Sequence, residues 1–155
     1  MSSHIRNSAK ALILRDGKLL CTKNLSQFNE IYYLLPGGGV DHGETVVAAL
    51  ERECMEEAGV RVAVKALRYV REYIADHHEF TNIHAGIHQI EYMFECDLLE
   101  QRALAPGHTP DKYQTGVEWL PLSSLNDFLL FPKLLKTLIK SDGTITGDVY
   151  LGDVN

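Results

Sequence analysis

The chain has 155 residues, of which 45% are hydrophobic and 23% are charged, as in an ordinary globular protein. This length predicts a single domain, spanning residues 1–155, with enough apolar residues for a core. The 21 Asp and Glu outnumber the 15 Lys and Arg, which gives a formal net charge of −6. An acidic surface repels a phosphate backbone and argues against general nucleic-acid binding. We expect a cytoplasmic protein with no membrane partner, because the sequence shows no signal peptide and no apolar run of about 18 residues.

The three cysteines, Cys21, Cys54 and Cys96, lie far apart and form no CxxC pair. This spacing is not typical of a zinc site or a disulfide framework. We interpret them as small buried apolar side chains in a reducing compartment.

In the first third of the chain, apolar and β-branched runs predict strands at 5–14, 18–23 and 31–35. Asp16-Gly17 has the composition of a tight hairpin turn, and a polar loop is expected at 24–30. The segment from Thr45 to Ala58 predicts a helix, since Thr45 suits the N-cap and Gly59 suits the position after the C-terminal end.

Strand character returns after Gly59. Strands are expected at 60–74, 87–98 and 117–120, with polar loops at 76–84 and 100–114. A turn with a short helix is expected at 121–128, a second helix at 132–140 and an edge strand within 143–155. Together these elements predict an α+β fold in which helices flank a mixed sheet.

Three carboxylates crowd the end of the predicted central helix. Glu53, Glu56 and Glu57 share one face, where each like-charged pair costs about 0.2–0.5 kcal/mol. The negative end of the helix dipole disfavours Glu56 and Glu57 by about 0.3–1 kcal/mol each. Arg52 can reach Glu56 one turn on, but it cannot neutralise all three. Converging carboxylates suit Mg²⁺ or Mn²⁺. The alternative interpretation is an ordinary solvated acidic face.

A run of three glycines precedes this helix. Gly37, Gly38 and Gly39 follow a buried strand, and glycine permits positive φ and close approach of the backbone to a ligand. The backbone of Gly38 and Gly39 is therefore a candidate substrate contact, and the Gly37 carbonyl is a candidate metal ligand. The alternative is a simple turn, which rarely needs three glycines.

The spacing of these residues resembles the box of the Nudix hydrolase family. Gly38 is followed after five residues by Glu44, and after seven more by the segment Arg52-Glu53-Cys54-Met55-Glu56-Glu57-Ala58-Gly59-Val60. Cys54 stands at an apolar position that family members usually fill with Leu, Ile or Val. The segment Leu35-Pro36-Gly37-Gly38 before the box and the segment from Val117 to Leu122 are also similar to the family.

The resemblance implies an α/β/α sandwich in which the box forms a loop, a helix and a loop. It implies hydrolysis of a nucleoside diphosphate linked to another moiety. By position, Glu53, Glu56 and Glu57 would bind Mg²⁺ or Mn²⁺, with help from the Gly37 carbonyl. Arg52 would orient Glu53, and Glu44 would brace the loop against the helix.

The chemistry needs a base as well as a divalent cation. A pyrophosphate resists attack by water until its negative charge is neutralised, and a carboxylate then accepts the proton of the attacking water. Glu53 is our candidate for this base. Family members also take a base or ligand from a loop outside the box, and the candidates here are Glu79, Glu91, Asp111 and Glu118.

The substrate is less well indicated. Asp76, His77 and His78 stand where ADP-ribose or dinucleoside polyphosphate hydrolases of the family often have Pro or Tyr, so neither signature is present. Tyr32 and Tyr33 precede the glycines and are candidates for stacking on a base, Tyr33 above all, although core packing is the usual role of such residues. By default, Arg68 and Arg71 are expected on a solvated face.

A cluster of histidines, comprising His77, His78, His84 and His88, is interpreted as part of a polar loop beside the site rather than as a second metal site. Two substrate classes stay open: a nucleotide sugar-like compound, or a nucleoside triphosphate, normal or oxidised. The alternative functions are a non-catalytic domain that binds or senses a nucleotide, and a structural domain with an acidic face. Homodimers are common in the family, and the tail residues suit such an interface.

Overall fold

The computed structural model describes residues 4–79, 85–101 and 113–155. Its strands and helices follow in chain order: β1 (Ile5–Arg15), β2 (Lys18–Leu25), β3 (Ile31–Leu34), β4 (Gly37–Gly39), α1 (Val46–Ala58), β5 (Val60–Ile74), η1 (Ala75–His77), β6 (His88–Gln101), β7 (Gln114–Pro121), η2 (Leu122–Asp127), β8 (Leu130–Phe131), α3 (Leu135–Leu138) and β9 (Tyr150–Asp153).

The strands form one mixed and curled sheet in the order β8-β3-β2-β1-β6-β5-β9. In addition, β4 pairs with β1 and β7 pairs with β2. The β1–β6, β3–β8 and β5–β9 pairs are parallel, and the other pairs are antiparallel. The pairing of β1 with β2 is short, from Leu14↔Leu19 to Arg15↔Lys18, so the sheet divides beyond it into two halves that share β1.

The predicted hairpin turn is confirmed at the end of β1. Asp16 and Gly17 both have positive φ, 50° and 73°, which is the conformation of a turn that matches the twist of a hairpin. An aspartate followed by a glycine adopts it at low cost, because both residues tolerate the left-handed region.

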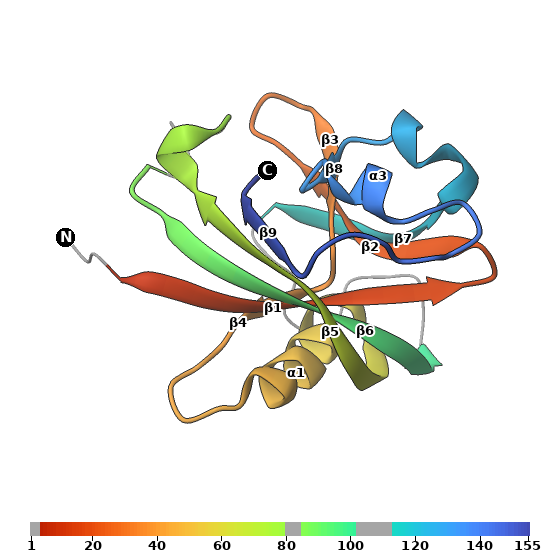
Figure 1. Ribbon diagram of the computed structural model, residues 1–155, viewed down its shortest axis with the longest axis horizontal. Helices are drawn as coiled ribbons and strands as arrows, with labels where there is room; N and C mark the ends of the chain where they lie inside the picture. Colours follow the sequence, from red (N-terminus) through yellow and green to blue (C-terminus); the bar gives the residue numbers. More distant parts are fainter. Residues whose placement is uncertain (1–3, 80–84, 102–112) are drawn as a thin grey trace.

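Helices cover opposite sides of the sheet, as the sandwich expectation required. Figure 1 shows α1 beneath β1, β5 and β6, with η2 and α3 on the other side. Ala9 and Ala11 on β1 are fully buried and small, which lets α1 pack closely through Leu50 and Cys54. A second core lies on the opposite face of β1. The residues at its centre are Leu12, Leu19, Tyr33, Tyr69, Met93, Leu120, Leu130 and Leu135.

The central helix begins and ends as predicted. Thr45 is the N-cap, and its side chain accepts a hydrogen bond of 3.0 Å from the Ala48 N–H. Gly59 ends the helix with φ 66°, in the left-handed region that glycine adopts readily, and its N–H donates to carbonyls of the last turn.

The prediction of a second helix at 132–140 is wrong in extent, because only Leu135–Leu138 is α-helical. Ile139 turns to an extended conformation and forms a bridge with Ile145, so the chain reverses instead of adding another turn. The expected edge strand is confirmed as β9, which pairs with β5 at the end of the sheet.

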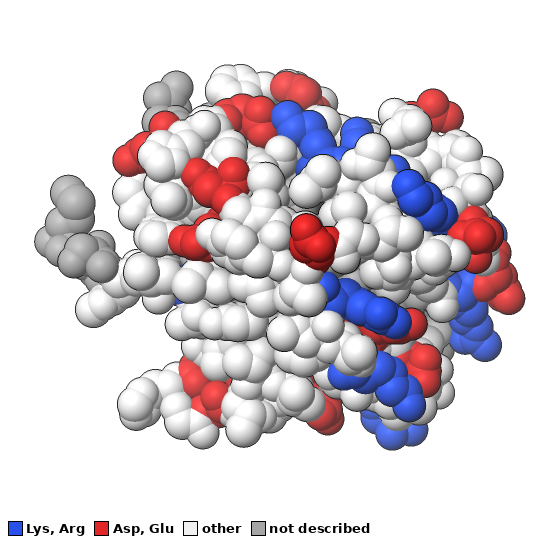
Figure 2. Space-filling model, in the orientation of Figure 1, with Lys and Arg blue, Asp and Glu red and all other residues white. Residues whose placement is uncertain are grey.

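The surface and the cysteines agree with the composition. Cys21, Cys54 and Cys96 are free and buried, as predicted, and burial raises the pKa of all three thiols. On the face drawn in Figure 2, Lys and Arg gather on the right among Asp and Glu, whereas Asp and Glu predominate among the charged side chains on the left. Within the described part of the chain, no helix is long and apolar enough to cross a membrane.

Candidate active site

Arg52 joins the loop before α1 to the acidic face of the helix. Its guanidinium donates two hydrogen bonds, of 2.8 and 2.9 Å, to the two oxygens of Glu44, and one of 3.0 Å to the Gly39 carbonyl. Its Nη1 donates to Glu53 and to Glu56, both at 3.0 Å. The bonds from Arg52, followed by one from the Asp41 N–H, bring the pKa of Glu44 to about 2, and the bond to Glu44 raises the pKa of Arg52.

The three glutamates expected to bind a cation lie together on α1 but differ in exposure. Glu57 is buried with 5% of its surface exposed, while Glu53 and Glu56 are partly exposed. Arg52 contacts Glu53 through Oε1 and Glu56 through Oε2. Across residues 4–79, 85–101 and 113–155, no three His, Cys, Asp or Glu side chains are gathered closely enough to hold a metal as they stand.

Even so, the residue types fit a hard divalent cation. Glu53, Glu56 and Glu57 offer carboxylate oxygens on adjacent turns of one helix, the donor set that Mg²⁺ and Mn²⁺ prefer. The site also contains a cradle that an added Cβ would fill. A Cβ on Gly38 would lie 2.5 Å from the carboxyl carbon of Glu53, so the missing side chain leaves room for that carboxylate.

Each glycine of β4 has its own steric reason. Gly37 has φ 141°, and a Cβ there would lie 2.0 Å from the Ala9 carbonyl oxygen on the paired strand β1. A Cβ on Gly39 would lie 2.9 Å from Nη2 of Arg6. The three glycines therefore serve strand pairing, the Glu53 carboxylate and the Arg6 guanidinium in turn.

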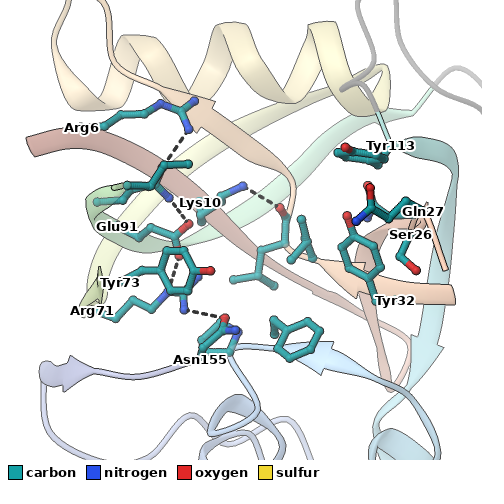
Figure 3. A pocket seen from close by; sticks show the side chains of 17 residues that line it. Arg6, Lys10, Ser26, Gln27, Tyr32, Arg71, Tyr73, Glu91, Tyr113 and Asn155 are labelled. Carbon is teal, nitrogen blue, oxygen red and sulfur yellow. Dashed lines mark hydrogen bonds and ion pairs between the residues drawn. The ribbon is translucent and has the colours of Figure 1, made fainter. Parts of the chain in front are cut away.

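A cavity of about 310 Å³ opens on the face of β1 opposite α1. Figure 3 shows Arg6, Glu91 and Arg71 on one side, and Tyr32, Gln27 and Tyr113 on the other. Its volume is at the lower end of the range for small-molecule pockets. The cavity lies between the two halves of the curled sheet, because β1, β5 and β6 supply one wall and β2 and β3 supply the other.

A chain of polar side chains runs along the first wall. Arg6 donates 2.8 Å to Gln89, and Gln89 donates 2.7 Å to Glu91. Glu91 accepts 2.6 Å from Nε of Arg71, and both of these side chains are 6% exposed. Burial raises the pKa of Glu91, but Arg71 and Lys10 lower it more, so its pKa lies below the usual range. Arg71 also donates to the Val154 carbonyl at 2.6 Å.

Arg71 corrects the expectation that it lies on a solvated face. Arg68, three residues earlier, does lie on the surface, where it pairs with Glu95. The alternation of β5 places Arg71 between Tyr69 and Tyr73 on the buried face, and its guanidinium lies 5.2 Å from the Tyr73 ring centroid. The sequence signal for this burial was that Arg71 lies two residues from both Tyr69 and Tyr73, and therefore on the same strand face.

The two candidate tyrosines face opposite ways. Tyr33 is 7% exposed in the core, and its hydroxyl donates 2.7 Å to Glu118. Burial and this bond raise the pKa of Tyr33 to about 12. Tyr32 lines the cavity and meets Phe131 edge-on, with 6.2 Å between the ring centroids. The structure thus gives Tyr33 the core-packing role and brings Tyr32, not Tyr33, to the cavity.

The candidate carboxylates outside the box are dispersed. Glu79 is exposed and pairs with Lys133. Glu91 lines the cavity in its ion pair, and Glu118 is hydrogen-bonded to Tyr33. Asp111 lies outside the described residues.

The histidines flank the tail strand. His77 and His78 each lie 2.7 Å from a different oxygen of Asp153, and His88 lies 3.0 Å from Glu72. The Asp153 contacts join η1 and its C-cap to β9, whereas the Glu72 contact joins β5 and β6. His84 lies outside the described residues. In the part of the chain that the structure describes, they form no second metal cluster.

Sequence reasoning missed most of the cavity. Arg6, Lys10 and Gln89 carry no motif, and they meet only because β1 and β6 pair in parallel with Arg6 opposite Gln89. The available signal was that Arg6 and Lys10 lie four residues apart on one strand, and therefore on the same face of it.

Comparisons with known proteins agree with the box and the fold. A model of the NUDIX domain matches residues 4–140. Among solved structures, a NUDIX hydrolase from Nitrosomonas europaea is 18% identical with a TM-score of 0.68, and the match covers 86% of this chain and 85% of that one. A MutT NUDIX hydrolase from Burkholderia pseudomallei is 25% identical with a TM-score of 0.57, covering 77% and 85%.

An ADP-ribose pyrophosphatase from Streptococcus suis 89-1591 is 16% identical with a TM-score of 0.60, covering 97% of this chain and 100% of that one. At such identities the likeness concerns the fold. The match of the domain model over most of the chain, together with the unbroken box from Gly38 to Val60, leads to one conclusion: this chain belongs to the Nudix family of pyrophosphohydrolases.

Proposed function

We propose that the protein is a Mg²⁺- or Mn²⁺-dependent hydrolase that cleaves the pyrophosphate of a nucleoside diphosphate linked to another moiety. One observation carries the proposal. Arg52 bonds at once to Glu44, Gly39, Glu53 and Glu56, so the loop, the glycines and the acidic helix form one connected unit. A solvated acidic face would not need such a network.

In this proposal Glu53, Glu56, Glu57 and the Gly37 carbonyl would hold the cation, which would supply neutralisation of phosphate charge and a more acidic water. Arg52 binds Oε1 of Glu53 and so orients this carboxylate. Glu53 then acts as the base that takes a proton from the attacking water. Glu44 fixes the guanidinium through a two-point contact, and the backbone of Gly38 and Gly39 lies against the substrate.

The cavity supplies a place for the organic part of the substrate. Tyr32 offers an aromatic face, and Asn24, Gln27 and Asn155 offer amides that can recognise a base or a sugar. Both substrate classes, a nucleotide sugar-like compound and a nucleoside triphosphate, are compatible with this chemistry. The experiment must therefore include both.

The test is chromatographic detection of products from a panel of nucleotides with Mg²⁺ or Mn²⁺. The panel contains ADP-ribose, nucleotide sugars, dinucleoside polyphosphates, and normal and oxidised nucleoside triphosphates. We expect turnover of one class, and we expect Glu53→Gln to lower kcat by about 10²–10⁴-fold, as for loss of a general base.

The matched control is Glu51→Gln, because Glu51 is an exposed glutamate on the same helix. It should leave kcat within about twofold, the range of a surface change away from the site. If Glu53→Gln behaves like the control, Glu53 is not the base. If nucleotides bind without turnover, the protein is a nucleotide-binding member of the family instead.

A further inference from the structure

Lys10 lies where the cavity meets the glycine strand. Its side chain lines the cavity, and its Nζ lies 3.4 Å from the Leu35 carbonyl oxygen and 3.5 Å from that of Gly37. Both distances are long for a charged donor. Among the described residues, these are the hydrogen bonds that its three N–H groups make. In Figure 3, Lys10 extends between the cationic and the aromatic walls.

Arg6 lies on the same face of β1, two alternations earlier, and is the second cation at this end of the cavity. Its Nη1 bonds to Gln89, and its guanidinium packs against the backbone of Gly39. Arg71, by contrast, is neutralised by its buried pair with Glu91. The charge available to an anion is therefore concentrated beside β4, next to the box.

The Gly37 carbonyl oxygen has two candidate partners, the Lys10 ammonium and the divalent cation. Under the proposed function it would bind a divalent cation, yet the Lys10 ammonium already contacts it. Two positive charges on one oxygen repel each other, so Lys10 must leave when the carbonyl is used as a metal ligand. The cavity in front of it is the open direction for that movement.

We propose that Lys10 and Arg6 form a subsite for the pyrophosphate of the substrate, and that Lys10 exchanges the Leu35 and Gly37 carbonyls for a phosphate oxygen. The inference rests on the proposed function and adds a prediction to it. Lys10 opposes binding of the cation alone and favours binding of the phosphate alone. Binding of the cation and binding of the substrate are therefore positively coupled. The cation displaces Lys10 toward the phosphate, and the phosphate draws Lys10 away from the Gly37 carbonyl.

The test compares Lys10→Met with Lys23→Met. Lys23 is a partly buried strand lysine on β2 outside the cavity lining, so it is a matched control. One calorimetric titration measures Mn²⁺ binding without substrate. A second measures binding of inorganic pyrophosphate in the presence of a chelator that removes divalent cations. For Lys10→Met we expect Mn²⁺ to bind about fivefold or more tightly, the effect of removing a like charge at about 4 Å in water. Pyrophosphate should bind about tenfold more weakly.

Opposite shifts in the two titrations support the proposal, with Lys23→Met unchanged in both. Shifts in the same direction, or Lys10→Met behaving like Lys23→Met, overturn it. Lys10→Arg should restore pyrophosphate binding, and Lys10→Gln replaces Lys10→Met if the thermal unfolding midpoint shows that the latter does not fold. Absence of Mn²⁺ binding and of turnover in the unaltered protein would contradict the proposed function, whereas normal turnover without the opposite shifts contradicts only the exchange.

Discussion

The acidic box and the cavity are built in contrasting ways, although they meet at β4. The box lies in one short stretch of chain from Gly38 to Val60, and a single arginine ties its parts together. The cavity is lined from segments that reach from Arg6 to Asn155. The box depends on local spacing along one helix, whereas the cavity depends on the register of strands that are far apart in sequence.

We therefore expect the buried ion pair of the cavity to contribute mainly to stability, and the box carboxylates to contribute mainly to catalysis. In the cavity, the charges of Glu91 and Arg71 neutralise each other and are buried, so the loss of either one should destabilise the fold. In the box, Glu53 and Glu56 stay partly exposed, so their loss should remove activity while the fold survives. Substitutions in the two regions should therefore affect different properties of the protein.

The largest effect on stability is expected for Glu91→Gln, which leaves Arg71 charged and buried. Breaking a buried pair by removing one partner should lower the free energy of unfolding by about 3 kcal/mol or more. Because the folded pKa of Glu91 is depressed, its contribution is present above the unfolded pKa and is lost as the pH falls through the folded value. Urea denaturation at pH 7 and at acid pH measures both effects.

The control for that variant lies on the same two strands. Arg68 and Glu95 also pair β5 with β6, but these side chains are 42% and 36% exposed. Glu95→Gln should change the free energy of unfolding by no more than about 1 kcal/mol, as for a surface ion pair. Equal losses in the two variants would mean that burial does not distinguish the pairs.

Two glycines one residue apart should separate the two kinds of loss within β4. Gly37→Ala places a Cβ against the backbone of Ala9 at φ 141°, and should lower the free energy of unfolding by about 3 kcal/mol. Gly38→Ala displaces the movable carboxylate of Glu53 instead. It should change stability by less than about 1 kcal/mol, while kcat falls sharply. Denaturation and kinetics on both variants check this, and a stable, inactive Gly37→Ala would contradict it.

What the sequence could predict follows the same division. The helix from Thr45 to Gly59 and its carboxylates were predictable, because capping and i, i+4 spacing are local rules. For Arg71 the only local signal was its place between Tyr69 and Tyr73, since its burial also depends on β6 lying beside β5 and supplying Glu91. The helix predicted at 132–140 was too long for a similar reason, because Ile139 leaves the helical path to pair with Ile145.

A smaller effect is expected from the tyrosine pair. If Tyr32 stacks on the substrate, Tyr32→Leu should lower kcat/KM about tenfold, within the range of base–aromatic stacking. Tyr33→Phe removes only the bond to Glu118, so it should cost about 1 kcal/mol of stability and leave kcat/KM unchanged. Steady-state kinetics with the best substrate of the panel measures kcat/KM of both variants. A loss of kcat/KM confined to Tyr33→Phe would show that Tyr33, not Tyr32, is the substrate contact.

The smallest effect should come from Asp153, which joins β9 to η1. Partial burial raises its pKa, but bonds with His77, the Ile74 N–H and His78 outweigh this and bring the pKa to about 2. The contribution of Asp153 is therefore present above the unfolded pKa of about 3.9 and fades as the pH falls toward 2. It should be at most about 1 kcal/mol, because His77 is largely exposed.

Asp153→Asn should accordingly be slightly less stable than the unaltered protein at pH 6, and the gap should narrow near pH 2. Asp148→Asn is the control, since Asp148 is an exposed aspartate on the same tail. Thermal unfolding across this pH range measures the gap. Arg71 also contacts Val154, the residue after Asp153, so a gap that rivals that of Glu91→Gln would mean that the tail and the buried ion pair form one cooperative unit. The cavity would then depend on β9 as strongly as on β6.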